Sequence, residues 1–428
     1  MKLRIKDYTQ KVGSGVTPRG GAETYLDQGI PLFRSQNVTN EGFLMEDIAY
    51  ISEEVDEAMK GTRVKPGDVL LNITGASIGR CYYTSNDFQR GNVNQHVCII
   101  RPKKRIANPA YLHYCLISNQ GQEQIELTQS GANRQGLTIE EIRNFSFDIP
   151  SKEDQQRIVD YLDAKLSAID KRMAVLEKQQ DTYTRLKKST IHQAVTRGLN
   201  PNVRLKDSDI EWIGMIPEHW CRFRLKDLGY MYGGLTGKSG DDFRCDDATK
   251  TKPYIPFTNI LNHTVIDNRK LHYVVMREDE QQNKVKANDL IFLMSSEDYE
   301  SIAKSAVVMG AIGEVYLNSF CRGLRITYKE CYAPFLNYQL NSEIYRDALR
   351  LEARGFTRIN IKVDRVASHF ISLPPLSEQQ AIAAYLDEKC AKIDAALENI
   401  GKQIEASKRL KRATINEAIS GKAKIGNN

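Results

Sequence analysis

The chain contains one long stretch twice, and this duplication constrains its fold more than any other feature. The two copies are residues 149–198 and 373–422, and they align without a gap. Both contain a Gln-Gln pair, then a Tyr-Leu-Asp-x-Lys block, and later an Arg-Leu-Lys run. A chain with such a repeat is expected to be built from two similar halves.

Each copy has the pattern of a long helix. Apolar residues recur at steps of three and four from Ile158 and from Ile382 onward, which is the seam of a coiled coil. A proline precedes each copy, and Ser151 and Ser377 begin sequences typical of a capping box. A helix of about 45 residues would reach ~68 Å. Because such a helix cannot bury its apolar stripe alone, we expect the two copies to pair as an antiparallel coiled coil. The alternative is that each copy packs on a local neighbour.

The sequence outside these stretches is also duplicated. VKPGDVLL at 64–71 returns as VKANDLIF at 285–292, and short apolar runs lie between Gly, Pro, Asn and Asp residues. This pattern predicts two α+β domains of short strands. In the first domain we expect one helix over 109–126. The expected order is a first globular domain (1–150), a central helix (151–198), a linker (199–220) anchored by Trp212 and Trp220, a second globular domain (221–374) and a C-terminal helix (375–422).

Charge and cysteine content narrow the classes of function. The net charge of +6 permits nucleic-acid binding without requiring it. The eight cysteines form no Cys-x-x-Cys pair, so neither a zinc site nor a disulfide framework is expected, and a reducing cytoplasm fits best. The N-terminus lacks a leader pattern and no stretch is apolar enough to span a bilayer, so we expect no association with membranes.

No catalytic motif is recognisable in the sequence. GGLTGKS at 233–239 lacks the glycine spacing of a phosphate-binding loop. Asp163 and Asp387 lie in the predicted helices without converging carboxylates, so we expect them on a solvated face or beside the seam. His96 and His113 are interpreted as ordinary packed or surface residues. The chain is therefore not expected to be an enzyme or to bind a metal or cofactor itself.

Polar side chains suited to base edges cluster in the turns of both domains. Arginine pairs with guanine, and asparagine or glutamine with adenine. Turn formation is the competing explanation, because Asn and Gly are common turn residues. The candidate DNA-binding residues are Arg34, Ser35, Gln36, Asn37, Ser77, Arg80, Asn92, Asn94, Gln95, Asn133, Arg134 and Gln135 in the first domain, and Lys238, Ser239, Thr258, Asn259, Lys304, Arg354, Thr357, Arg358 and Asn360 in the second.

The blocks QQRIVDYLDAKLSAID and EQQAIAAYLDEKCAKID, together with WIGMIPEHW before the second domain, resemble the specificity subunits of Type I restriction-modification systems. The resemblance extends over nearly the whole chain. It implies a subunit without catalysis of its own, whose two target-recognition domains each read one half of a split, asymmetric site in double-stranded DNA.

The resemblance also implies partners. Two methyltransferase subunits, which use S-adenosylmethionine on adenine, would dock on the helices, and the helices would space the two domains. Restriction and translocase subunits that consume ATP with Mg could join the complex. Two other functions remain open at this point: a coiled-coil scaffold whose globular ends bind proteins, and a free-standing DNA-binding regulator.

Overall fold

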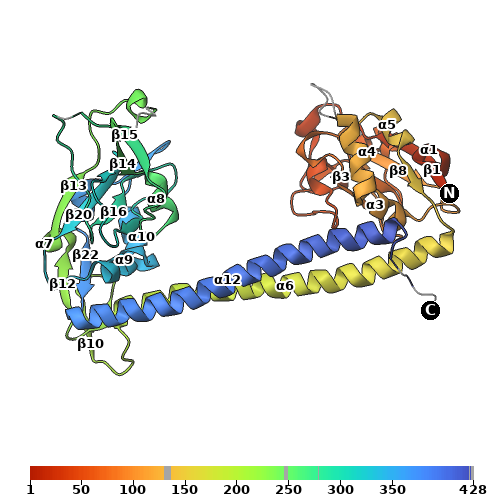
Figure 1. The fold of residues 1–428 in the computed structure, drawn as a ribbon. Coiled ribbons are helices and arrows are strands. Elements are labelled where there is room, and N and C mark those ends of the chain that lie inside the picture. Colours follow the sequence, from red (N-terminus) through yellow and green to blue (C-terminus); the bar gives the residue numbers. More distant parts are fainter. Residues whose placement is uncertain (130–135, 245–248, 278, 424, 426–428) are drawn as a thin grey trace. The chain divides into compact units, whose positions relative to one another are not determined.

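The computed structural model describes residues 1–428 except 130–135, 245–248, 278, 424 and 426–428 (Figure 1). The chain divides into two compact units, Met1–Glu177 with Lys402–Asn428, and Lys178–Gly401. Each unit contains one globular domain and a part of both long helices. In the part of the chain that the structure describes, every helix is too polar or too short to traverse a lipid bilayer.

The first domain is built on two small sheets whose facing side chains share a core, with Phe33, Leu70 and Ile99 in one apolar cluster. One sheet has the order β2-β8-β5-β6 and is antiparallel, and the other has the order β4-β3-β7, with β3 and β7 parallel. The strands are β1 (Lys2–Arg4), β2 (Thr9–Ser14), β3 (Ile30–Phe33), β4 (Ala49–Ile51), β5 (Val69–Asn72), β6 (Cys81–Tyr83), β7 (Asn92–Val93), β8 (Val97–Pro102) and β9 (Ser146–Asp148), and β1 pairs with β9.

The sequence of β5 explains its central place. All four of its residues are buried, because Leu70 faces the second sheet while Val69 and Leu71 face the helices on the other side. Gly67 precedes the strand with a φ of +85°, a left-handed conformation that glycine adopts without strain. The second domain has Asn288 with a φ of +67° in the same turn, and asparagine is among the few other residues that tolerate it.

The helices of the first domain differ from expectation at one point. The single helix predicted over 109–126 is two helices, α3 (Pro109–Ile117) and α4 (Asn119–Gln129), so that prediction is wrong. Ser118 between them is extended, and its hydroxyl donates to the carbonyl of Cys115 at 2.7 Å and accepts from the amide of Gly121 at 3.3 Å. The remaining helices are α1 (Ile5–Tyr8), α2 (Glu53–Ala58) and α5 (Ile139–Asn144), with short turns at Gly21–Thr24, Ser35–Asn37, Lys60–Thr62 and Gly75–Ser77.

The second domain repeats this plan. Its sheets have the orders β13-β20-β16-β18 and β15-β14-β19, and the pairs β12-β22 and β17-β21 stand beside them. The strands are β12 (Cys221–Arg224), β13 (Gly229–Gly233), β14 (Thr251–Ile255), β15 (His272–Val275), β16 (Leu290–Leu293), β17 (Ser295–Ser296), β18 (Ser305–Val307), β19 (Tyr316–Leu317), β20 (Cys321–Ile326), β21 (Ile359–Asn360) and β22 (Phe370–Leu373). The helices are α7 (Leu225–Leu228), α8 (Phe257–Asn262), α9 (Ala333–Asn341), α10 (Glu343–Leu351) and α11 (Val363–Ala367), with a short turn at Gly240–Phe243.

Before the second domain, the linker forms a hairpin of β10 (Leu205–Asp207) and β11 (Met215–Pro217). Trp220 is fully buried in the core of the unit. The ring of Trp212 stacks on that of His369, with 4.9 Å between their centroids. The prediction that both tryptophans anchor the linker is confirmed.

The duplicated stretches form α6 (Lys152–Arg197) and α12 (Leu376–Ile419). Before α6, the hydroxyl of Ser151 accepts from the amide of Asp154 at 3.1 Å, as the capping box predicts. The second helix begins before Ser377, so the expected start at that serine is wrong. There the carbonyl of Pro375 accepts from the amide of Gln379 at 3.0 Å.

Within each unit, the start of one long helix packs against the end of the other. In the first unit Leu166 and Ile415 belong to one core, and Lys411 pairs with Asp170 at 2.9 Å. In the second unit Lys187 pairs with Asp394 at 2.6 Å. The pairing is antiparallel, which confirms the expected fold class.

The repeated Gln-Gln pair ties each helix to its domain. The side-chain carbonyl of Gln155 accepts from the amide of Asn108 at 2.8 Å, and that of Gln379 accepts from the amide of Tyr332 at 2.8 Å. Both glutamines are fully buried. These residues repeat because each makes the same contact between helix and domain.

The aspartates of the repeated blocks make a second contact of this kind. The hydroxyl of Tyr114 donates to Asp163 at 2.5 Å, and that of Tyr338 donates to Asp387 at 2.7 Å. Burial and the neighbouring carboxylate raise the pKa of Tyr338. Both aspartates are exposed on the helix surface, as expected, and each also accepts a hydrogen bond from its domain.

Candidate nucleic-acid interface

Four candidate residues of the first domain meet at one hollow. Ser35, Gln36, Ser77 and Arg80 line an open depression of about 370 Å³, together with Thr74, Gly75, Ala76 and His96. The residues come from three separate segments: the turn after β3, the turn after β5 and the turn before β8. The fold thus gathers hydrogen-bonding groups that are distant in the sequence at one open surface.

Buried amides and a histidine hold these segments together. The Asn72 side chain donates to the carbonyls of Ser35 at 2.7 Å and Val38 at 3.1 Å, which fixes the turn after β3. The hydroxyl of Thr74 lies 2.7 Å from Nδ1 of His96, and Nε2 of the same ring lies 2.9 Å from the amide of Gln95. Thr74 and His96 are absent from the residues predicted from the sequence, because a lone Thr or His carries no signal there.

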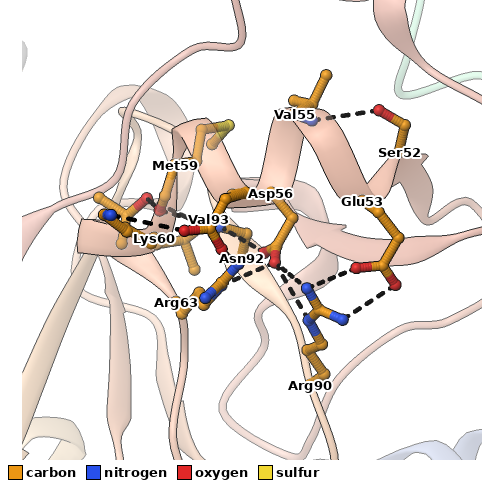
Figure 2. A network of polar contacts seen from close by, with 12 residues as sticks. Ser52, Glu53, Val55, Asp56, Met59, Lys60, Arg63, Arg90, Asn92 and Val93 are labelled. Atoms are coloured by element: carbon orange, nitrogen blue, oxygen red, sulfur yellow. Dashed lines mark hydrogen bonds and ion pairs between the residues drawn. The ribbon is translucent and has the colours of Figure 1, made fainter.

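Asn92 proves to be part of the fold and does not face the solvent. Its amide donates to Oδ1 of the fully buried Asp56 at 3.0 Å, and Arg63 and Arg90 contact Oδ2 of the same carboxylate at 2.7 and 2.5 Å (Figure 2). Burial alone would raise the pKa of Asp56, but the hydrogen bonds from Asn92, Arg90 and Arg63 outweigh it and leave the pKa lowered. Asn92 therefore stabilises the domain and offers no free edge to a base.

Three more candidates of the first domain are occupied within the protein. The Asn37 side chain donates to the carbonyls of Leu44 and Asp47, both at 3.1 Å. Arg34 donates to the carbonyl of Asp47 at 2.7 Å. Asn94 is buried and accepts from the amide of His96 at 3.1 Å. Of the first-domain candidates, Gln36, Arg80 and Gln95 are exposed, and Ser35 and Ser77 are half-buried at the hollow.

Asn133, Arg134 and Gln135 lie outside the described residues. The end of that segment is placed, because Gly136 forms an antiparallel bridge with Thr74 and the amide of Leu137 donates to the carbonyl of Ile73 at 2.8 Å. Thr74 lines the hollow, so Gly136 lies next to a residue of that lining.

In the second domain, the aligned segment is described. Ser295 and Ser296 of β17 pair with Asn360 and Ile359 of β21, in the manner of Thr74 with Gly136. The guanidinium of Arg358 lies over the ring of Phe320, 4.3 Å from its centroid. The ring of Phe320 is 6.4 Å from that of Phe257, and both rings are 38% exposed.

The corresponding surface of the second domain is thus aromatic where that of the first is polar. In the aligned sequences, Phe257 and Phe320 occupy the positions of Ser35 and His96. The sequence interpretation missed both rings because it searched for hydrogen-bonding side chains, and an exposed phenylalanine resembles a core residue until its surroundings are known. Arg354, Thr357, Arg358 and Asn360 are exposed on the loop beside these rings.

Four of the other second-domain candidates, Lys238, Ser239, Asn259 and Lys304, have partners within the protein. Lys238 is 6% exposed, donates to the carbonyl of Val275 at 2.6 Å and pairs with Glu280. The buried Asn259 donates to the carbonyls of Asp267 and Lys270. Burial lowers the pKa of Lys304, which donates to the carbonyl of Leu261 at 3.0 Å. Ser239 caps the short turn after it by contacting Asp242, and Thr258 is half-buried.

Within the described residues, no group of three or more His, Cys, Asp or Glu side chains could hold a metal ion. Burial lowers the pKa of His113 to about 3, so the ring is neutral at physiological pH, and it packs among Tyr82, Tyr83 and Tyr114. The surfaces described above present hydrogen-bonding groups, cations and aromatic faces, which suit a nucleic-acid ligand.

The sequence matches the family of the Type I restriction modification DNA specificity domain over residues 2–179 and 217–406. Each matched range contains one domain and most of the long helix that follows it. The match extends over most of the chain, and the chain therefore belongs to this family.

Curated relatives and solved structures agree with this assignment. The chain is 22% identical to the MjaVIII specificity subunit of Methanocaldococcus jannaschii over 99% of its own length and 93% of that protein. It is 27% identical to the EcoKI specificity subunit of Escherichia coli over 49% of its own length and 44% of that protein. A chain from a structure on the complex assembly and conformational transition of the type I R-M system has its fold, with a TM-score of 0.73 at 15% identity over 99% of this chain and 98% of that one. The HsdS subunit from Thermoanaerobacter tengcongensis gives a TM-score of 0.55 at 17% identity over 99% and 97%.

Proposed function

We propose that this specificity subunit reads a split, asymmetric site in double-stranded DNA, with one half-site bound by each domain. The observation that carries the proposal is the duplicated architecture with divergent surfaces. The two domains share strand order and the glutamine and tyrosine contacts to the helices, yet one has Ser35 and His96 where the other has Phe257 and Phe320. Two readers with a common scaffold and different surfaces would recognise two different half-sites.

The partners in this proposal are methyltransferase subunits. The Gln and Tyr–Asp contacts recur with the same geometry in both units, so two copies of one partner would find two equivalent surfaces formed by helix and domain. The adenine chemistry, with S-adenosylmethionine, would belong to those partners. ATP and Mg would belong to restriction and translocase subunits, where the host has them. The complex would act in the cytoplasm, where it can reach the chromosome.

Co-expression with a candidate methyltransferase subunit from the same host tests the proposal. Genome-wide mapping of methylated adenines should return one bipartite sequence with an unread gap, and native mass spectrometry should give one copy of this chain with two methyltransferases. A gel-shift assay should show sequence-specific binding only with the partner present.

The two other functions predict different results. A free-standing regulator would bind its site equally well without a methyltransferase. A coiled-coil scaffold would bind no specific DNA in either case, and mapping would find no methylated motif that depends on this chain.

A further inference from the structure

Phe356 is the most exposed large apolar side chain among the described residues, with a relative exposed area of 104%. It lies in the loop between α10 and β21, beside the aromatic surface of the second domain. Removing a phenylalanine side chain from water stabilises a protein or complex by about 1.5–3 kcal/mol. A ligand that covered the exposed ring of Phe356 would gain binding free energy of this order. The aligned residue of the first domain is Ala132, so the feature belongs to the second domain only.

The loop that carries Phe356 is closed and braced. The backbones of Arg354 and Asn360 exchange two hydrogen bonds of 2.9 Å each, which confine residues 355–359 to a tight turn. A Cβ atom added to Gly355, whose φ is +146°, would lie 2.0 Å from the carbonyl oxygen of Arg358. Only glycine therefore fits where the backbones of residues 355 and 358 approach each other. The hydroxyl of Tyr299 contacts the carbonyl of Gly355 at 3.4 Å. A braced loop loses little conformational entropy when it binds.

The charges around the ring favour an anionic ligand. Arg354 and Arg358 flank Phe356 within the loop, and both are exposed. In the neighbouring segment, Asp298 accepts from the amide of Ser301 at 2.6 Å, and Glu300 pairs with Arg350 at 2.6 Å. Glu297 is the remaining acidic residue of that segment and is exposed. An apolar tip between two cations is the pattern of a side chain that enters stacked bases while its neighbours meet phosphates.

We propose that Phe356 is a wedge that inserts between two adjacent base pairs of the second half-site and partly unstacks them. The inference rests on the proposed function of this domain and adds a mode of recognition to it. The ring would select a step that unstacks at low cost, and pyrimidine–purine steps such as TA and CA are the most easily opened. The second half-site would then be read partly by deformability, in a domain whose exposed groups at this surface include the Arg358–Phe320 pair and Phe257.

The test uses the complete complex with its methyltransferase subunits and a duplex carrying the site returned by methylation mapping. 2-Aminopurine replaces one adenine at a time, because its fluorescence rises when stacking is lost. The target adenines are expected to brighten in both half-sites, since methyltransferases extrude their target base. The inference predicts one further bright position in the second half-site with the wild-type chain.

Three variants separate the wedge from other causes. Phe356→Ala should extinguish the further bright position and weaken binding about ten-fold, in keeping with the stacking of one base on an aromatic ring. Phe356→Trp should keep both. Leu351→Ala removes another exposed apolar side chain of the same domain, 76% exposed, and should change neither.

The results that overturn the inference differ from those that overturn the proposed function. If the wild-type complex methylates and binds its site but shows no position that depends on Phe356, or if Phe356→Ala binds as tightly as Leu351→Ala, the wedge is wrong while the two-domain reader stands. If Phe356→Ala fails to assemble with the methyltransferase, the ring contacts a protein and the wedge is also wrong. If the wild-type complex shows no specific binding, the proposed function itself fails.

Discussion

The side-chain carbonyl of Gln379 accepts a hydrogen bond from the backbone amide of Tyr332 at 2.8 Å, and this contact joins α12 to the second domain. The same side chain donates to the carbonyls of Glu330 and Pro374, both at 2.8 Å. One buried amide thus satisfies three backbone groups, which is why a hydrophobic residue of similar size could not replace it. Gln155 makes the corresponding set of contacts in the first unit.

Replacing Gln379 with alanine should destabilise the second unit. The change leaves a buried amide and two carbonyls without partners, and each such group costs about 1–3 kcal/mol. Thermal unfolding should occur several degrees lower. Gln380→Ala is the matched control, because the neighbouring glutamine is exposed and its loss should leave the melting temperature nearly unchanged. Equal melting temperatures for the two variants would contradict the role assigned to Gln379.

His113 should make the first unit sensitive to mild acid. Burial lowers its pKa to about 3, whereas an unfolded histidine titrates near pH 6.5. Between these values the unfolded chain binds a proton that the folded chain excludes, so stability falls as the pH falls below 6.5, by up to about 1.4 kcal/mol per pH unit. His113→Asn introduces the residue that the second domain has at the aligned position, Asn337, and should reduce this dependence.

Melting temperatures at pH 7.5 and pH 5.5 would measure the effect of His113. His192→Asn, at an exposed histidine, is the control and should keep the acid sensitivity of the wild type. Because the asparagine could loosen the core at every pH, the histidine signals of the wild type provide a second measurement by NMR. A His113 signal that titrates near pH 6.5 in the folded protein would contradict the prediction.

Arg80 and Arg358 should contribute to different half-sites. If each reads a guanine, alanine at Arg80 should relax the first half-site and alanine at Arg358 the second, each by roughly 1–3 kcal/mol, without effect on the other half. Arg134, which the sequence analysis also names as a candidate for base contact, makes a further test in the first half-site. Methylation mapping of each variant measures the change. A uniform loss on all sequences with a shallower salt dependence would instead make these residues phosphate contacts.

The sequence predicts the order of domains and helices well, because the apolar periodicity identifies the two long helices and the internal repeat identifies the two similar domains. The candidate site is predicted less completely. Asn92 and Gln36 look alike in the sequence, since asparagine and glutamine suit a turn, a buried network or a base edge equally. Only the approach of Asp56, far away in the chain, shows that Asn92 belongs to a buried network. The break at Ser118 depends likewise on a serine hydroxyl that contacts both helices, and the hydroxyl of Ser342 in the second domain donates to the carbonyl of Gln339 as that of Ser118 donates to Cys115.

The length of the paired helices should set the gap of unread base pairs between the half-sites. Helix α6 runs without a break from Lys152 to Arg197, through the residues at which the two units meet in the sequence. Four residues inserted after Gln179 add about one turn, ~6 Å, which is close to one or two base-pair rises. A coiled coil can absorb such an insertion by local unwinding without losing its apolar seam. A second variant carries this insertion and four further residues after Lys402. The ion pairs Asp170–Lys411 and Lys187–Asp394 define the register of the antiparallel helices, and in this register Lys402 corresponds to Gln179.

Methylation mapping of these insertion variants should return the same two half-sites with a gap longer by one or two base pairs. The expected result follows because no residue of the recognition surfaces is changed, and the doubly inserted variant should show the change most cleanly since both helices remain in register. Four residues inserted at Asn202 in the exposed linker lengthen the chain but neither helix, and should leave the gap as it is. An unchanged gap with full methylation in the helix variants would mean that the helices do not determine the spacing.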